Sequence, residues 1–165
     1  MRLMNIFAFV LITGLIVAAP AQVSTDQRAQ RALSVLASLQ ANVKWNPETV
    51  LRADFDHDGQ EDFAFSGTQD GSFVLGIVGN SLDDKAKRWV FRFSIVSPSR
   101  KINQICSLNA KIETRSPVLL GSGKRMWHIP PASRAISLDD GCDPIDVTWD
   151  QDNKKFELLR IHVIL

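Results

Sequence analysis

The residues best suited to chemistry lie in one acidic loop, 54–62, which reads Asp-Phe-Asp-His-Asp-Gly-Gln-Glu-Asp. The first three aspartates alternate along the chain, so we expect their carboxylates to point into one concavity while Phe55 and His57 point away. Gly59 takes the sixth position, where such a loop needs a sharp turn, and Ca²⁺ prefers about six to eight oxygen ligands. The spacing predicts a calcium site with these ligands: Asp54, Asp56, Asp58, Asp62 and the backbone carbonyl of Gln60.

The same loop concentrates negative charge. Five carboxylates, counting Glu61, fall within these nine residues, and no Lys or Arg lies among them. Like charges this close repel by on the order of 1 kcal/mol per pair at surface dielectric, and a bound divalent cation removes that penalty. The alternatives are Mg²⁺ or another cation, or a turn without an ion, because Asp and Gly are also common turn residues. An EF-hand is excluded, since Phe65 takes the twelfth position in place of a bidentate Glu.

The stretch Arg52–Phe65 resembles the FG-GAP/VCBS (integrin-α-like) calcium loop, whose pattern is D-x-D-x-D-G-x-x-D between two strands. The resemblance covers about residues 50–66 and implies Ca²⁺ bound by the ligands named above. In that family the motif usually repeats in a β-propeller, but here it occurs once, so the propeller is not implied. The rest of the chain is similar to small exported bacterial proteins with one such loop, a disulfide and a terminal Trp-Asp hairpin, a group that implies no defined activity.

Residues 1–21 are predicted to be a secretory signal peptide. Arg2 supplies the positive charge, a run of about 14 apolar residues follows, and Ala19-Pro20-Ala21 offers small residues for cleavage. The apolar run is short for a membrane span of roughly 20 residues; an uncleaved anchor is the alternative. Loss of Arg2 leaves 18 basic against 18 acidic residues in the mature chain, 22–165. We expect a periplasmic or secreted protein with no stable membrane span after cleavage.

Export determines how the two cysteines are interpreted. In an oxidising compartment, Cys106 and Cys142 are expected to form one disulfide. A catalytic thiol and a zinc site are less favoured, because the chain has no C-x-x-C and its three histidines lie far apart. A second acidic cluster, Asp139–Asp143, lacks alternate spacing, so we predict a turn that leads into the disulfide.

The elements that position the loop are predicted from hydrophobic periodicity. Apolar residues recur at helical spacing over 24–43, and Pro47 prevents the helix from continuing. Strand patterns follow, with Asp70-Gly71 as a strong hairpin turn. The expected strands cover residues 49–54, 62–67, 72–79, 87–96, 104–113, 135–138, 145–149 and 156–161. We predict an α+β fold, with one N-terminal helix packed on a mainly antiparallel β-sheet, as a single small disulfide-bonded domain over 22–165.

Composition and motifs limit the function. The 19 basic and 18 acidic residues argue against nucleic-acid binding, which needs a basic surface. Gly121–Lys124 suggests a phosphate loop, but Val118 replaces the required Gly and Arg125 the required Ser or Thr. No Ser/His/Asp order, histidine cluster or glycosidase-like carboxylate pair is recognisable.

The sequence therefore favours an exported, non-enzymatic domain that binds one structural Ca²⁺ and a partner, which we expect to be an exported or envelope protein or a glycan. A periplasmic enzyme inhibitor or immunity protein, inserting a loop such as 114–134 into its target, is the more specific alternative. A hydrolase with an unrecognised site is the third.

Overall fold

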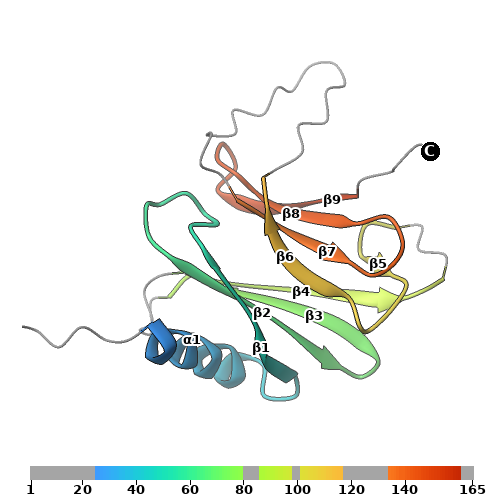
Figure 1. Ribbon diagram of the computed structural model, residues 1–165, viewed down its shortest axis with the longest axis horizontal. Helices are drawn as coiled ribbons and strands as arrows, with labels where there is room; N and C mark the ends of the chain where they lie inside the picture. Colours follow the sequence, from blue (N-terminus) through green and yellow to red (C-terminus); the bar gives the residue numbers. More distant parts are fainter. Residues whose placement is uncertain (1–24, 80–85, 98–100, 117–133, 161–165) are drawn as a thin grey trace, which may run out of the picture.

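The computed structural model describes residues 25–79, 86–97, 101–116 and 134–160. Over these ranges the chain forms one helix and nine strands, and the strands make two sheets (Figure 1). The predicted signal peptide lies outside the described residues. Within them, no helix is both long and apolar enough to cross a membrane.

The first sheet has five strands in the order β1-β2-β3-β4-β5. Their bounds are β1 Lys44–Ala53, β2 Asp62–Gln69, β3 Ser72–Val78, β4 Arg88–Ile95 and β5 Gln104–Ile105. β1 to β4 form an antiparallel meander, and the short β5 pairs in parallel with the end of β4. The predicted hairpin turn is confirmed: Asp70 and Gly71 connect β2 to β3 with φ values of 49° and 72°, as a two-residue type I′ turn requires.

The helix and β1 differ from their predicted bounds. Helix α1 (Thr25–Leu39) ends before residue 43, and β1 begins at Lys44 rather than at residue 49, although it contains Pro47. The pairing of β1 with β2 is irregular between Asn46 and Leu51, so the proline lies in an interrupted part of an edge strand. A proline lacks the backbone N–H that a strand donates to its neighbour, and at this interruption no such bond is lost. Pro47 therefore ends the helical pattern without preventing a strand.

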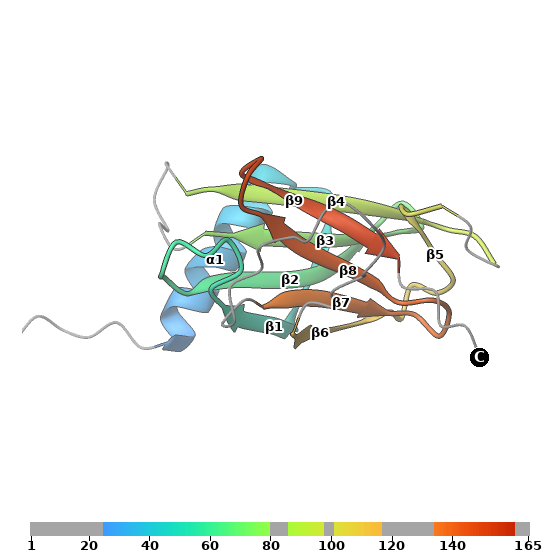
Figure 2. The ribbon, with the colours of Figure 1, turned by 90° about the horizontal axis from the view of Figure 1, so that it is seen from above.

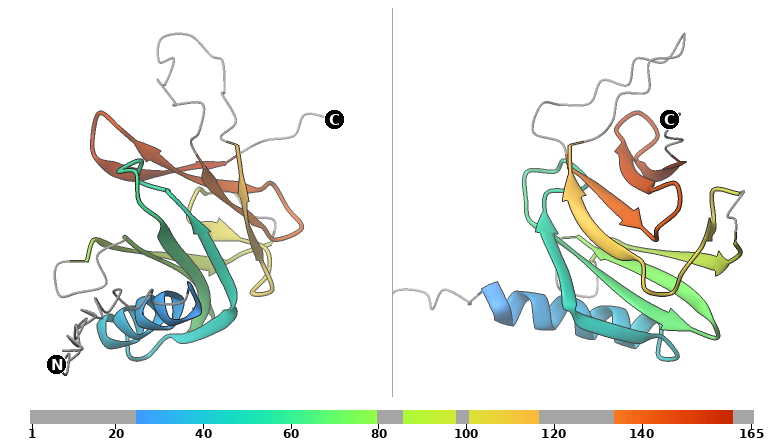
Figure 3. Two further views of the ribbon diagram at one scale, coloured as in Figure 1. Left: turned by 60° about the vertical axis from the view of Figure 1, so that its left-hand side comes forward. Right: turned by 45° about the vertical axis from the view of Figure 1, so that its right-hand side comes forward.

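The second sheet has four strands in the order β6-β7-β8-β9. Their bounds are β6 Lys111–Arg115, β7 Ala135–Asp139, β8 Ile145–Asp150 and β9 Lys155–Arg160. All neighbours are antiparallel, and the predicted terminal hairpin is confirmed as β8 and β9. Figure 3 shows β6 beside β1, the edge strand of the first sheet.

The helix and the two sheets form three layers, with the five-stranded sheet in the middle (Figures 1 and 2). The residues of β2 show why the five-stranded sheet is the middle layer: alternate side chains of a strand face opposite sides of its sheet. Phe63 and Phe65 pack in a cluster with Ala32 and Leu36 of α1, whereas Ala64 belongs to the core between the sheets. That larger core also holds these buried side chains: Phe55, Phe73, Leu75, Ile77, Phe93, Ile105, Ala110, Ile136, Leu138, Ile145, Val147, Trp149 and Phe156.

The predicted α+β fold class is wrong. The chain has a mainly β fold, with one short helix and two β-sheets rather than one. The difference arises in the predicted strand 104–113, where β5 ends at Ile105, β6 begins at Lys111, and the residues between them form turns. Leu108, in the middle of that predicted strand, is 39% exposed. At this turn the chain leaves the first sheet and begins the second.

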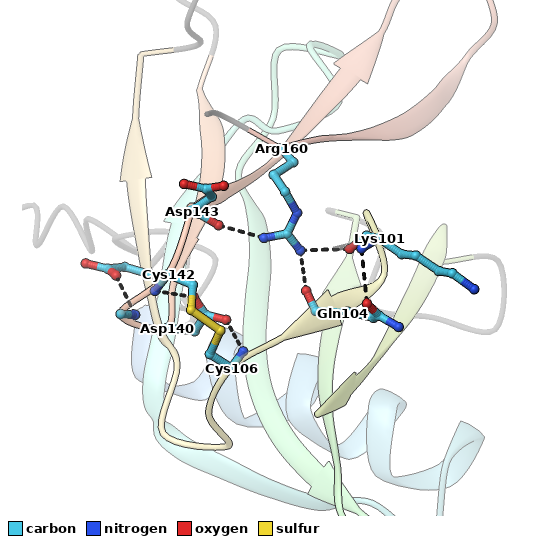
Figure 4. Close-up of a disulfide and its surroundings, with 9 residues drawn as sticks. Lys101, Gln104, Cys106, Asp140, Cys142, Asp143 and Arg160 are labelled. Carbon is cyan, nitrogen blue, oxygen red and sulfur yellow. Dashed lines mark hydrogen bonds between the residues drawn. A yellow bond between two sulfur atoms is a disulfide. The ribbon is translucent and has the colours of Figure 1, made fainter. Parts of the chain in front are cut away.

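The predicted disulfide between Cys106 and Cys142 is present and joins the two sheets (Figure 4). Cys106 follows β5 of the first sheet, and Cys142 lies between β7 and β8 of the second. The carboxylate of Asp140 accepts the backbone N–H groups of both cysteines. Arg160 of β9 adds a second connection, since its guanidinium donates to the carbonyls of Lys101, Gln104 and Asp143. The disulfide and these hydrogen bonds therefore connect β5 of the first sheet to the β7–β8 turn of the second.

Gly67 allows β1 to pass close to β2. A methyl group at this position would lie 2.8 Å from Val43 Cγ1 and 2.9 Å from the carbonyl oxygen of Lys44. We expect Gly67→Ala to lower the free energy of unfolding by about 1–3 kcal/mol, because a strand backbone cannot yield as a flexible side chain can. Urea denaturation measures the change, and Thr68→Ala in the same strand is the control with a smaller effect. Equal stability of Gly67→Ala and the wild type would contradict this explanation.

Candidate metal centre

The acidic loop connects β1 to β2, and the pairing of Ala53 with Asp62 closes its base. Phe55 anchors it, because this side chain is fully buried in the core between the sheets. The loop turns sharply at His57 and Gly59, whose φ values of 56° and 87° are left-handed. Glycine takes this conformation without steric cost, and its presence at the sixth position matches the turn predicted there.

Three of the predicted ligands converge. Carboxylate oxygens of Asp54, Asp56 and Asp58 all lie within 4.8 Å of one another. The first aspartate accepts the N–H groups of Asp58 at 3.1 Å and Gly59 at 2.9 Å, and the second accepts the N–H of Asp58 at 3.2 Å. Gln60 is exposed, and its N–H donates to Asp58 Oδ1 at 3.1 Å. The loop thus gathers three carboxylates by bonds to its own backbone, while the Gln60 carbonyl stays a predicted ligand.

Asp62 differs from the other three aspartates because it is fully buried. Its Oδ2 accepts the N–H of Phe55 at 2.8 Å and of Asp56 at 3.1 Å, which ties the start of the loop to the start of β2. Its Oδ1 is buried and has no hydrogen-bond partner among the described residues. Burial, and then the negative charge of Asp56, raise the pKa of Asp62 to about 7. An oxygen that is buried, acidic and without a partner is unfavourable unless a cation or a proton satisfies it.

Lys87 approaches the carboxylates from a distant part of the chain. Its Nζ lies 2.7 Å from Asp56 Oδ2, on a fully buried side chain, and 3.3 Å from Asp58 Oδ2. The pKa of Lys87 is raised, chiefly by the hydrogen bond to Asp56. Counting residues within the loop alone could not reveal this partner. The pairing register of β2, β3 and β4 explains the contact. The pairs Phe63–Val78 and Val78–Arg88 place the starts of β2 and β4 at the same end of the sheet, so Lys87 lies near the acidic loop.

Arg28 of α1 is a second cation that the local sequence does not reveal. Its guanidinium lies 3.3 Å from Glu61 Oε2, and its other terminal nitrogen donates to the Glu61 carbonyl at 3.5 Å. The same group lies over the ring of Phe63, 5.4 Å from its centroid. Helix α1 therefore neutralises the one acidic side chain of the loop that lies outside the predicted ligand set.

The residues at this site fit a hard divalent cation. Their donors are carboxylate oxygens, which Ca²⁺ and Mg²⁺ prefer and softer metals do not. Oδ1 of Asp62 lacks any hydrogen bond within the described part of the chain, and the contact of Asp56 and Asp58 with Lys87 shows that they attract positive charge.

A second group with metal-ligating side chains is formed by Cys106, Asp140 and Cys142. It is unsuited to a metal because both sulfurs are in the disulfide and thiolate is the form that binds metals. Asp140 is engaged by the N–H groups of both cysteines, and Asp139 Oδ1 accepts the N–H of Gly141 at 3.1 Å. This acidic cluster is the turn leading into the disulfide that the sequence predicts.

The chain was compared with protein-family models, with curated proteins and with solved structures, and nothing matches in any of the three.

Proposed function

We propose that this chain is an exported, non-enzymatic domain that holds one structural Ca²⁺ in its acidic loop and acts by binding a protein or a glycan. One observation carries the metal proposal: three carboxylates within 4.8 Å of one another stand next to a fourth whose buried oxygen has no partner in the described ranges. The resemblance of Arg52–Phe65 to the FG-GAP/VCBS loop supports the same ion.

The residues that would hold Ca²⁺ are Asp54, Asp56, Asp58, Asp62 and the carbonyl of Gln60. The ion would supply positive charge to a loop whose carboxylates otherwise repel one another and depend on Lys87. It would fix the connection between β1 and β2 and, through Phe55, the core beneath it. The role in this proposal is structural, and no reaction step is assigned to the metal.

Export is the second part of the proposal. The disulfide between Cys106 and Cys142 supports it, because disulfides persist mainly in oxidising compartments. The residues proposed for cleavage, 1–21, lie outside the described residues. So do most of those in loop 114–134, which the inhibitor alternative requires.

Thermal unfolding with and without metal tests the calcium proposal. We expect millimolar Ca²⁺ to raise the Tm by several degrees over EDTA, because a ligand that binds only the native state stabilises it by about 2.7 kcal/mol at 100 times its Kd. Mg²⁺ should shift the Tm less, because it requires stricter octahedral geometry.

The matched variants are Asp56→Asn, which removes a central carboxylate charge, and Asp70→Asn, which removes one from the β2–β3 turn. Only Asp56→Asn should reduce the response to Ca²⁺. An unchanged Tm in the wild type, or an equal response in Asp56→Asn, would overturn the proposal.

A further inference from the structure

A depression lies next to the metal loop, between the start of β4 in the first sheet and the β8–β9 hairpin of the second. It has a volume of about 490 Å³ and is lined by the start of β4, by β8 and by the turn before β9. The residues that line it are Lys87, Arg88, Trp89, Trp149 and Lys154. We call it the aromatic depression.

The floor of the aromatic depression is a rigid group of rings. Trp89 packs edge to face on Trp149 and on Phe156, with ring centroids 5.6 Å and 4.9 Å apart, and the last two rings are 5.0 Å apart. Trp149 Nε1 donates to Gln151 Oε1 at 2.8 Å, which fixes that indole further. Trp149 and Phe156 are buried in the core between the sheets, and Trp89 is the partly buried ring through which this group can contact a ligand. Aromatic faces carry partial negative charge, which suits the polarised C–H bonds on the flat face of a sugar ring.

The rim of the aromatic depression is cationic. Lys87, Arg88 and Lys154 belong to the lining, and none of the described lining residues is acidic. Arg88 alternates with Trp89 along β4, so its side chain faces away from the core between the sheets, and Lys87 and Lys154 are the cations beside the rings. Their charges complement a ligand that combines a hydrophobic face with a negative group. A neutral sugar would use the rings alone, whereas a uronic acid, which is a sugar carrying a carboxylate, would use both features.

Lys87 belongs to both sites. Its side chain lines the depression, while its ammonium lies 2.7 Å from Asp56 Oδ2 and 3.3 Å from Asp58 Oδ2. A divalent cation bound to those carboxylates would replace and repel the ammonium, because two positive charges cannot share the same oxygens favourably. The displaced ammonium, on a flexible four-carbon stem that is half exposed, would then be available to the depression.

We propose that the aromatic depression binds a uronic-acid residue of a glycan, and that Ca²⁺ in the acidic loop strengthens this binding by releasing Lys87. The second clause rests on the proposed calcium site, whereas the first does not. The two ligands are then coupled: each binds more tightly in the presence of the other.

Calorimetric titration with two tetrasaccharides tests this proposal. Hyaluronan tetrasaccharide carries carboxylates on alternate sugars, and chitotetraose is its neutral control. We expect the hyaluronan fragment to bind at least about tenfold more tightly than chitotetraose in millimolar Ca²⁺, since charge-assisted hydrogen bonds contribute about 1.5–3 kcal/mol. In EDTA its affinity should fall by about the same factor.

Two variants locate the effect. Lys87→Met should abolish the Ca²⁺ dependence of hyaluronan binding, whereas a Ca²⁺ ion that merely bridged the saccharide and the protein would still act in this variant. Lys154→Gln, at an exposed position, should weaken binding of the hyaluronan fragment and not of chitotetraose. Unchanged binding of the fragment in both variants would overturn the proposed site.

The outcomes separate this proposal from the calcium proposal. One outcome is that hyaluronan binds in EDTA, that Lys154→Gln weakens this binding, and that Ca²⁺ does not change the Tm. This outcome supports the sugar site and overturns the metal site and its coupling. A Tm that rises with Ca²⁺, with no preference for hyaluronan over chitotetraose, overturns the sugar site and leaves the metal site intact.

Discussion

Replacing Cys106 and Cys142 together by alanine is expected to lower the free energy of unfolding by about 4 kcal/mol. The disulfide closes a loop over a sequence separation of 36 residues, and in the chain-entropy model a loop of that length stabilises the folded state by this amount. The bond joins the end of the first sheet to the β7–β8 turn of the second. Its loss lets these two points of the unfolded chain move apart, which raises the entropy of the unfolded state. Urea denaturation of the oxidised wild type and the double variant measures the difference.

A reducing agent provides the matched control for this prediction. Dithiothreitol should lower the unfolding midpoint of the wild type and leave the alanine double variant unchanged, because the variant has no disulfide to lose. Asp140→Ala should cost less, since it removes an acceptor from the N–H groups of both cysteines but keeps the covalent bond. Equal stability of the double variant and the oxidised wild type would contradict a stabilising role for the disulfide.

Local sequence patterns predicted the elements that depend on neighbouring residues. The β2–β3 hairpin follows from the turn at Asp70-Gly71, and β4 follows from the clean alternation of its aromatic residues. The second sheet was not predicted, because the alternation of apolar and polar residues identifies a strand but does not show which sheet the strand joins. Residues 104–113 alternate as one strand would, yet the turns after Cys106 divide them between the two sheets.

The same limit applies to the candidate site. Asp54, Asp56 and Asp58 converge because their alternate spacing over five residues already brings their carboxylates together. Lys87 reaches them only through the register of three strands, which no local pattern contains. The burial of Asp62 likewise depends on tertiary packing, so its position in the loop could be predicted but its raised pKa could not.

The stability of the metal-free protein is expected to fall as the pH rises from about 4 to about 7. In the folded protein the pKa of Asp62 is raised from 3.8 to about 7, mainly by burial. The folded state therefore binds this proton more tightly than the unfolded state, and the stabilisation is complete below pH about 4 and lost as the pH passes 7. At ~1.4 kcal/mol per pKa unit, this carboxylate would change the free energy of unfolding by a few kcal/mol. Urea denaturation in EDTA at a series of pH values measures the slope.

Asp62→Asn should remove the destabilisation that the buried charge causes at high pH. The asparagine is neutral and similar in shape, and its carbonyl can accept the N–H groups of Phe55 and Asp56 in place of Oδ2. In EDTA at pH 8 we expect the variant to be more stable than the wild type by up to a few kcal/mol. The difference should shrink as the pH falls and vanish below about pH 4, where the wild-type carboxyl is protonated in both the folded and the unfolded state.

Calcium should act in the opposite direction on the same pair of proteins. It would stabilise the wild type, whose ionised Asp62 offers an oxygen that has no hydrogen bond within the described ranges, and would stabilise Asp62→Asn much less. At pH 8, the Tm of the wild type should therefore rise relative to that of Asp62→Asn when Ca²⁺ replaces EDTA. If Asp62→Asn were the less stable protein in EDTA at pH 8, the buried charge would be compensated without metal, and the argument for a cation beside Asp62 would fail.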